Sequence, residues 1–195
     1  TRNFNSTSDF GRNFTEGKFG KGLVFDGLND HVNVSDNDEF TLASGFTLEA
    51  WVKSTTSSLS GNNGIINKDD SGQREFQFLI GGSFMDCVAL DNDNGATAYI
   101  GRRSSDHKNS FFNDLAWHHV SCTYDGGAGH SSLKIYVDGA RVDKTDYTPA
   151  SGFAAIRNTA SSVTIGSFRS ENFFNGAIDE LSIWNVSLSA EDIQR

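Results

Sequence analysis

Hydrophobic and polar residues alternate in short segments along most of the chain, and turn-forming residues separate these segments. Alternation with a period of two is typical of β-strands that bury one face. The pattern predicts strands near residues 22–26, 31–35, 46–53, 64–67, 75–80, 85–91, 96–101, 117–125, 133–138, 162–166 and 177–184. So many short strands favour an all-β fold in which two antiparallel sheets pack as a jelly-roll sandwich.

The clearest alternation lies in the last predicted strand. One face is expected to carry Ile178, Glu180, Ser182 and Trp184, and the other Asp179, Leu181 and Ile183. An acidic side chain at the start of a strand that enters a core needs a partner, because burying an unpaired charge is costly. Beyond this strand, the Ser189 hydroxyl is placed to cap a short helix through the amide of Asp192.

Turns are expected to depend on glycine and aspartate, since the chain has 20 Gly and a single Pro. Asp-Gly pairs at residues 26–27, 125–126 and 138–139 predict chain reversals. Residues 91–95 alternate Asp and Asn, but Gly101 stands where a calcium loop needs a bidentate Glu, so we expect a hairpin turn there. Longer polar segments at 54–63, 102–114, 126–131 and 143–160 predict loops, where binding groups are often found.

Composition narrows the class of protein. The 195 residues fit one domain, 1–195, with a core rich in its 16 Phe. The net charge of −9 argues against nucleic acid or an anionic membrane as partner. No apolar run is long enough to insert in a membrane and Thr1 begins no signal-peptide pattern, so we expect a soluble piece of a larger extracellular protein. Cys87 and Cys122 allow either a buried thiol pair or a disulfide, which an extracellular setting would favour.

Motifs in a characteristic order give the chain a family resemblance. They lie at residues 20–34, 46–52, 117–126 with 133–139, and 174–185. This ordered set resembles the laminin-G-like jelly rolls of the concanavalin A-like lectin and glucanase superfamily, over nearly the whole chain. The resemblance implies a carbohydrate-binding or adhesive role, although fold alone does not decide function. Three tryptophans fall in strand motifs of the family and are expected in the core: Trp51, Trp117 and Trp184.

The resemblance also implies a structural calcium ion. In this superfamily the first and last strands lie near each other, so Asp26 and Asp179 are expected to meet and share the metal. Carboxylate oxygens, completed by carbonyl groups and water, suit calcium. The alternative is that both acids accept backbone hydrogen bonds at turns. Asp69 and Asp70 lie where the loosely similar pentraxins supply some calcium ligands, but a solvated turn is the preferred interpretation.

Catalytic patterns are not found in the sequence. The glucanases of this superfamily place their acids on one strand in a Glu-x-Asp-x-x-Glu pattern, and this chain has no such strand. Asp179 and Glu180 are neighbours and so point to opposite faces. His118 and His119 are also adjacent, with one facing in and the other out, which favours structural roles. We therefore predict that the protein is not an enzyme.

A binding site is expected where a strand edge meets a polar loop. The predicted ligand-binding residues are Tyr99, Arg102, Arg103 and His107. Two guanidinium groups together would suit the oxyanions of an acidic polysaccharide. The sequence thus predicts a secreted or cell-surface, non-catalytic carbohydrate-binding or adhesion module, monomeric within a multidomain protein, with Ca²⁺ and a glycan at the rim. The alternatives are a laminin-G-type protein-interaction module and a polysaccharide-degrading glycosidase or lyase.

Overall fold

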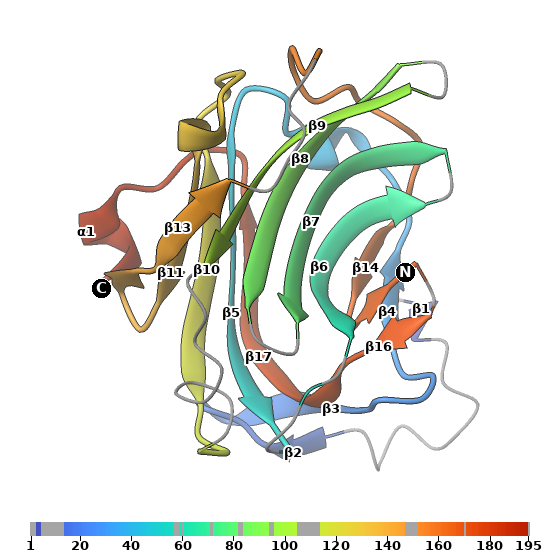
Figure 1. The fold of residues 1–195 in the computed structure, drawn as a ribbon. Coiled ribbons are helices and arrows are strands. Elements are labelled where there is room, and N and C mark those ends of the chain that lie inside the picture. Colours follow the sequence, from blue (N-terminus) through green and yellow to red (C-terminus); the bar gives the residue numbers. More distant parts are fainter. Residues whose placement is uncertain are drawn as a thin grey trace.

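Two antiparallel sheets form the fold in a computed structural model, which describes residues 3–4, 14–56, 59, 61–70, 72–81, 84–93, 96–104, 114–146, 152–169 and 171–194. The eight-stranded sheet has the order β1-β4-β14-β6-β7-β8-β9-β13. Its strands are β1 (Asn3–Phe4), β4 (Val32–Val34), β14 (Val163–Ile165), β6 (Asn62–Asp70), β7 (Gln73–Gly81), β8 (Met85–Asp93), β9 (Ala96–Ser104) and β13 (Asp143–Asp146). Figure 1 shows β6 to β9 as long, curved neighbours.

The seven-stranded sheet lies behind the first in Figure 1 and has the order β12-β11-β10-β5-β17-β3-β2. Its strands are β12 (Ala140–Arg141), β11 (Leu133–Val137), β10 (His118–Tyr124), β5 (Phe46–Ser54), β17 (Asn175–Trp184), β3 (Lys21–Asp26) and β2 (Phe14–Glu16). A separate hairpin pairs β15 (Ser167–Phe168) with β16 (Asn172–Phe173). The helices are short: the 3-10 turns η1 (Asp38–Phe40) and η2 (His130–Ser132), and α1 (Ala190–Ile193).

Every strand that the alternation predicts is present, so the jelly-roll sandwich is confirmed. The Asp138-Gly139 reversal is also confirmed, as both residues have positive φ and join β11 to β12. Ser189 caps α1 by accepting the Asp192 amide at 3.2 Å. The segment 143–160 differs from its prediction as a loop, because its first residues pair with β9 as strand β13.

The core lies between the two sheets and depends on aromatic rings. Phe46 of β5 contacts Phe76 of β7 across the sandwich, with ring centroids 5.4 Å apart, and contacts Tyr124 of β10 at the same distance. All three side chains are fully buried. Aromatic burial contributes stability beyond the area removed from water, and the Phe-rich composition led to this expectation.

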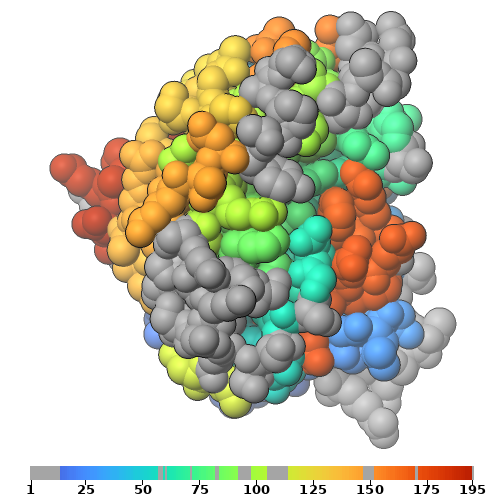
Figure 2. Space-filling model, viewed as in Figure 1, coloured from blue at the N-terminus to red at the C-terminus, as the bar shows by residue number. Residues whose placement is uncertain are grey.

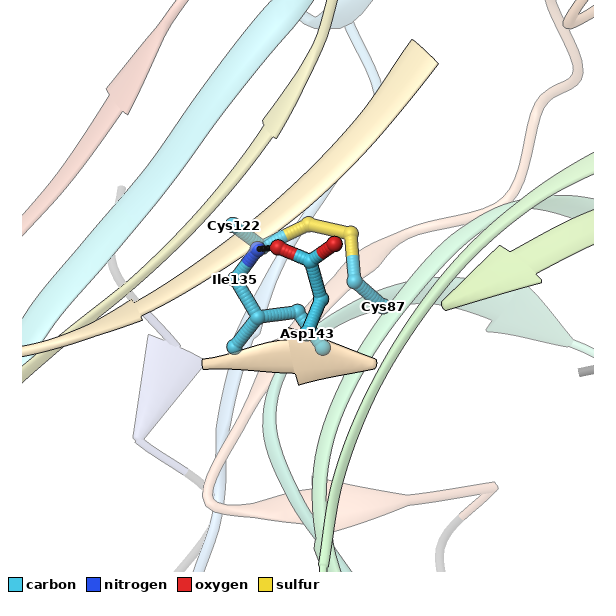
Figure 3. Close-up of a disulfide and its surroundings, with 4 residues drawn as sticks. All are labelled: Cys87, Cys122, Ile135 and Asp143. Carbon is cyan, nitrogen blue, oxygen red and sulfur yellow. Dashed lines mark hydrogen bonds between the residues drawn. A yellow bond between two sulfur atoms is a disulfide. The ribbon is translucent and has the colours of Figure 1, made fainter. Parts of the chain in front are cut away.

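A disulfide joins the two sheets. Cys87 of β8 and Cys122 of β10 are bonded, with Cα atoms 6.0 Å apart, and both are fully buried. Figure 3 shows the bond beside Asp143 of β13, which accepts a hydrogen bond from the Ile135 amide at 3.1 Å. Of the two arrangements open to these cysteines, the structure contains the disulfide.

The last strand contains a β-bulge, because Glu180 and Leu181 together lie opposite one residue of β5. Glu180 has φ +47° and is exposed. Leu181 therefore packs against the core, as Ile178 does. The predicted alternation, which put those two residues on opposite faces, is wrong beyond Asp179 because a bulge shifts the facing of every later side chain.

The tryptophans lie outside the core, contrary to prediction. Trp184 is 45% exposed, and its indole donates a hydrogen bond to Glu49 at 2.7 Å. Trp51 and Trp117 are half-buried. Phenylalanine, leucine and isoleucine fill the core instead. No helix in the described ranges is long and apolar enough to cross a membrane.

Candidate functional site

The outer surface of the eight-stranded sheet is hollowed. Figure 2 shows green atoms of β8 and β9 at the floor of this hollow, with β13 on one side and orange-red atoms of the β15–β16 hairpin on the other. We call it the first hollow; it encloses about 260 Å³. Its lining residues are Asn62, Arg74, Gln77, Leu79, Asp86, Val88, Leu90, Tyr99, Phe168 and Arg169.

Period-two alternation creates the floor. Gln77 stands between the core residues Phe76 and Phe78 on β7, so its amide points away from the core. Asp86 and Val88 take the same face of β8, where Asp86 pairs with Leu79 and Val88 with Gln77. Tyr99 of β9 lies opposite Leu90. The floor thus mixes apolar side chains with an amide, a carboxylate and a phenol.

The β15–β16 hairpin forms one wall of the hollow. It crosses close above β6 at Gly64, where a Cβ atom would clash with the carbonyl oxygen of Ser167. That same oxygen accepts a hydrogen bond from the Asn67 amide at 2.9 Å. Arg169, in the tight hairpin turn, has φ +55°, a conformation that is uncommon outside glycine. The turn presents Phe168 and Arg169 together, with the guanidinium 4.8 Å from the ring centroid.

Asp69 of β6 fixes this wall to the floor. Its carboxylate accepts two hydrogen bonds from the Arg169 guanidinium, each of 3.2 Å, and one from the Gln77 amide. Arg74 lies 3.5 Å away, measured from Nε to Oδ1. The Asp69 side chain has no exposed surface, so three side chains that line the hollow converge on one buried charge. The predicted solvated turn at this residue is therefore wrong.

Asp86 is held in a second ion pair. Arg103 donates two hydrogen bonds of 2.7 Å to its two oxygens, and the guanidinium stacks on Phe84 at 3.4 Å from the ring centroid. Burial raises the pKa of Asp86 above its ordinary range, although the Arg103 hydrogen bonds act in the opposite direction. Asp86 and Asp69 lie on strands either side of β7, five positions apart in register, or roughly 16 Å along the strands.

The distance between Asp69 and Asp86 decides whether the two acids could act together in glycoside hydrolysis. Glycosidases place their two carboxyl groups about 5 to 10 Å apart across the scissile bond. The two acids of the first hollow are farther apart, and each is already neutralised by arginine. Within the residues that the structure describes, this hollow offers surfaces for binding, without opposed acids for bond cleavage.

Comparison with known proteins decides the family. The sequence matches the model of the concanavalin A-like lectin/glucanases superfamily over residues 25–194. The chain belongs to this superfamily. No curated protein matches the chain.

Solved structures with the superfamily fold include several binding domains. The binding domain of Paraclostridial Mosquitocidal Protein 1 is 17% identical, with a TM-score of 0.66 over 98% of this chain and 46% of that chain. The binding domain of Botulinum Neurotoxin DC, in complex with SialylT, is 16% identical, with a TM-score of 0.62 over 93% of this chain and 43% of that chain. This chain thus spans less than half the length of either toxin domain.

A third similar structure is an accessory part of an enzyme. Domain 4 of AbnA, an extracellular arabinanase from Geobacillus stearothermophilus, was solved in complex with arabinotriose. It is 18% identical, with a TM-score of 0.60 over 93% of this chain and 78% of that chain. At these identities the likeness concerns the superfamily fold.

The predicted ligand-binding residues separate in the structure. Tyr99 lines the first hollow. Arg103 lies on the same face of β9, opposite Asp86, which also lines the hollow. Arg102 points to the other face, where it donates to Asp143 at 2.7 and 3.1 Å and also contacts Asp146. The two guanidinium groups are not brought together, because adjacent strand residues face opposite ways. His107 lies outside the described residues.

The predicted calcium ligands also separate. β3 and β17 do pair, but Asp26 lies opposite Asn175, four register positions from Asp179, or roughly 13 Å. Asp26 accepts hydrogen bonds from the Leu28 and Asn29 amides at 2.8 and 3.1 Å, and its pKa is lowered because its amide bonds outweigh slight burial. One ion cannot contact both carboxylates. No cluster of three metal-ligating side chains occurs in the described ranges.

Asp179 has a backbone role. Its carboxylate accepts hydrogen bonds from the amides of Phe19, at 2.9 Å, and Glu180, at 3.0 Å. Gly17 and Gly22 pack so closely against it that a Cβ atom at Gly17 would clash with its oxygen. The acid thus fixes the turn at residues 17–20 on the seven-stranded sheet. These are the backbone hydrogen bonds of the alternative interpretation, and calcium at Asp179 stays a prediction.

Sequence reasoning missed most of the first hollow. Polar residues within apolar strands were the available signal, since Gln77 and Asp86 each interrupt a run of core residues. No sequence signal connects Asp69 to Arg169, which lies 100 residues later. The histidine prediction is confirmed: His118 faces inward and is buried, while His119 lies beside Trp51 on the outer surface.

Proposed function

We propose that this domain is a non-catalytic carbohydrate-binding module that takes a glycan in the first hollow. The observation that carries the proposal is the convergence there of two rings, Tyr99 and Phe168, with an amide and two guanidinium groups. Sugars present an apolar C–H face and a ring of hydroxyls, which fit rings and planar polar groups respectively. Two structures of similar fold were solved with arabinotriose and with SialylT, which supports this choice.

The charge of the hollow favours a sugar that carries a carboxylate. Arg74 and Arg169 are 28% and 35% exposed and share a single carboxylate, that of Asp69. The other acid, Asp86, is matched by Arg103. Among the described residues at this hollow, the three guanidinium groups of these ion pairs thus meet two carboxylates, on a domain whose net charge is −9. A guanidinium can grip a carboxylate through two parallel hydrogen bonds, so uronic or sialic acid units fit this end of the hollow.

We further propose a setting outside the cytoplasm, within a longer polypeptide. The buried disulfide supports this, because such bonds persist in oxidising compartments. A module of this kind docks reversibly, and several modules in one parent protein would raise the avidity for a polysaccharide.

Titration calorimetry with α2,3-sialyllactose and trigalacturonic acid tests the proposal, with arabinotriose as the neutral comparison. We expect an acidic probe to bind, and Tyr99→Ala and Arg74→Ala each to weaken it about tenfold, or 1.4 kcal/mol. Lys144→Ala is the matched control, because it removes the same charge from an exposed position outside the hollow. Equal weakening by Lys144→Ala, or no binding of any probe at millimolar concentration, would sink the proposal.

A further inference from the structure

The opposite side of the sandwich carries a second hollow, over the outer surface of the seven-stranded sheet. It encloses about 340 Å³, and its lining includes Phe19, Trp51, His119, Asp138 and Gln194. None of these residues lines the first hollow. The two hollows lie on different sheets, so a ligand in one leaves the other open.

Rings from two strands and a turn build its floor and one wall. Trp51 of β5 lies opposite His119 of β10, with ring centroids 5.5 Å apart. Phe19 stands edge-on to Trp51 at 6.1 Å and 84°, and it is 57% exposed. Its position is fixed, because the carboxylate of Asp179 accepts the Phe19 amide. Asp179 thus fixes the Phe19 backbone, and the Phe19 ring rests edge-on against Trp51. The Lys18 ammonium lies over the Trp51 ring, 4.1 Å from its centroid, so the exposed ring of Phe19 is the stacking surface of this hollow.

The other wall is polar and comes from the β11–β12 reversal and the end of the chain. Asp138, at φ +50° in this reversal, accepts the His119 amide at 2.9 Å and contacts His118 Nδ1 at 2.7 Å. Its carboxylate is still 44% exposed, and each oxygen keeps a lone pair for a further donor. Gln194 donates to the Gly139 carbonyl at 3.2 Å, which places its amide at the rim.

We propose that this second hollow binds a neutral sugar unit. The C–H face of a pyranose or furanose ring would lie against Phe19, beside Trp51, and its hydroxyls would donate to the fixed Asp138 carboxylate. A hydroxyl pair suits a carboxylate that has two acceptor oxygens available. Asp138 is the only acid that lines this hollow in the described part of the chain, and the Lys18 ammonium over Trp51 offsets its charge, which suits a neutral sugar.

The arrangement gives the domain two sugar sites that face away from each other. Where both are filled, one copy of the module bridges two glycan chains; this consequence rests on the proposed function of the first hollow. The second site itself does not, because it shares no residue with the first.

Nitrogen-15 NMR of the intact domain tests the second site directly. The probes are methyl β-D-galactopyranoside, methyl β-D-glucopyranoside, methyl α-D-mannopyranoside and methyl α-L-arabinofuranoside, each at about 100 mM, which saturates sites with millimolar Kd. For at least one probe we expect the Trp51 indole and the amides of residues 18–20 and 138–140 to shift. Phe19→Ala should remove these shifts. Phe14→Ala should not, since Phe14 is similarly exposed, at 49%, but does not line the hollow.

The same spectra separate this proposal from the first. Amides of Gln77 and Leu79 report on the first hollow, so loss of binding there leaves the second readout intact. The second site is overturned if none of the four glycosides shifts the Trp51 indole, or if the shifts persist in Phe19→Ala.

Discussion

The two hollows are assembled by the same device from different chemistry. In each, a buried aspartate fixes a turn that carries a phenylalanine over a sheet. Asp69 fixes the turn of Phe168, which is half-buried, and Asp179 fixes the turn of Phe19, which is exposed. Glycines at 64 and 17 allow the close approach. Asp69 binds charged and amide side chains, whereas Asp179 binds backbone amides. In the second hollow a ring is thus positioned by an aspartate that pairs with backbone amides, and no charged side chain is needed at the hollow to balance that aspartate.

The disulfide lies between the two hollows and should matter equally to both. It joins β8, beneath the first, to β10, beneath the second, and closes a loop with a sequence separation of 35 residues. Cys87→Ala with Cys122→Ala should lower the free energy of unfolding by about 4 kcal/mol, because the open chain gains entropy when unfolded. Urea unfolding measures this, and the reduced natural chain is the control. A variant as stable as the oxidised chain would contradict the prediction.

The next largest effect is expected from Asp69→Ala, which should affect the first hollow and leave the second unchanged. Asp69→Ala leaves Arg169, Arg74 and Gln77 without their shared acceptor, so we expect a loss of about 3 kcal/mol of stability and loss of binding in the first hollow. The Trp51 indole signal of the second hollow should stay in place. Asp70→Ala is the matched control; Asp70 is exposed and should change stability by less than about 0.5 kcal/mol. Equal losses from both variants would remove the anchoring role of Asp69.

Asp179→Ala should cost less, about 1 to 2 kcal/mol, because it removes two hydrogen bonds to backbone amides and no ion pair. The loss should be the same in calcium buffer and in EDTA if the backbone amides are the partners on which Asp179 depends. Thermal unfolding in both buffers measures this, with the exposed neighbour Glu180→Ala as control. A loss confined to calcium buffer would restore the predicted ion.

The sequence was sufficient for the sheets because alternation reports local facing directly. Gln77 between Phe76 and Phe78 must point away from the core whatever the rest of the chain does. The Glu180 bulge escaped prediction since one extra residue leaves no compositional mark. The hollows escaped it for a different reason. Each depends on a turn packed on a strand that is distant in sequence. Phe19 and Asp179 are 160 positions apart, and no sequence pattern indicates that they form a hydrogen bond.

The smallest expected effect is on the pH dependence of stability. The contribution of Asp86, in the first hollow, should have the opposite sign to that of Glu49, on the outer face of the seven-stranded sheet. Asp86 lines the first hollow, and its burial raises its pKa. Glu49 lies beside His119 on the outer face of the seven-stranded sheet. The His119 hydrogen bond lowers the pKa of Glu49, helped by the Trp184 indole, although partial burial opposes this. A raised carboxyl pKa stabilises the fold below the unfolded value and loses that stability as pH rises through the folded value. A lowered one stabilises above the unfolded value and loses it as pH falls.

The stability difference between the natural chain and Asp86→Asn should therefore shrink as pH rises above about 4, where an unfolded aspartate ionises. The difference for Glu49→Gln should grow over the same range. Urea unfolding at steps between acid and neutral pH measures both slopes, and Lys144→Gln, at an exposed position, corrects for general charge effects. Slopes of the same sign would mean that the Arg103 hydrogen bonds, rather than burial, decide the direction of the Asp86 pKa shift. Asp86 would then be stabilised in its charged form, as Glu49 is.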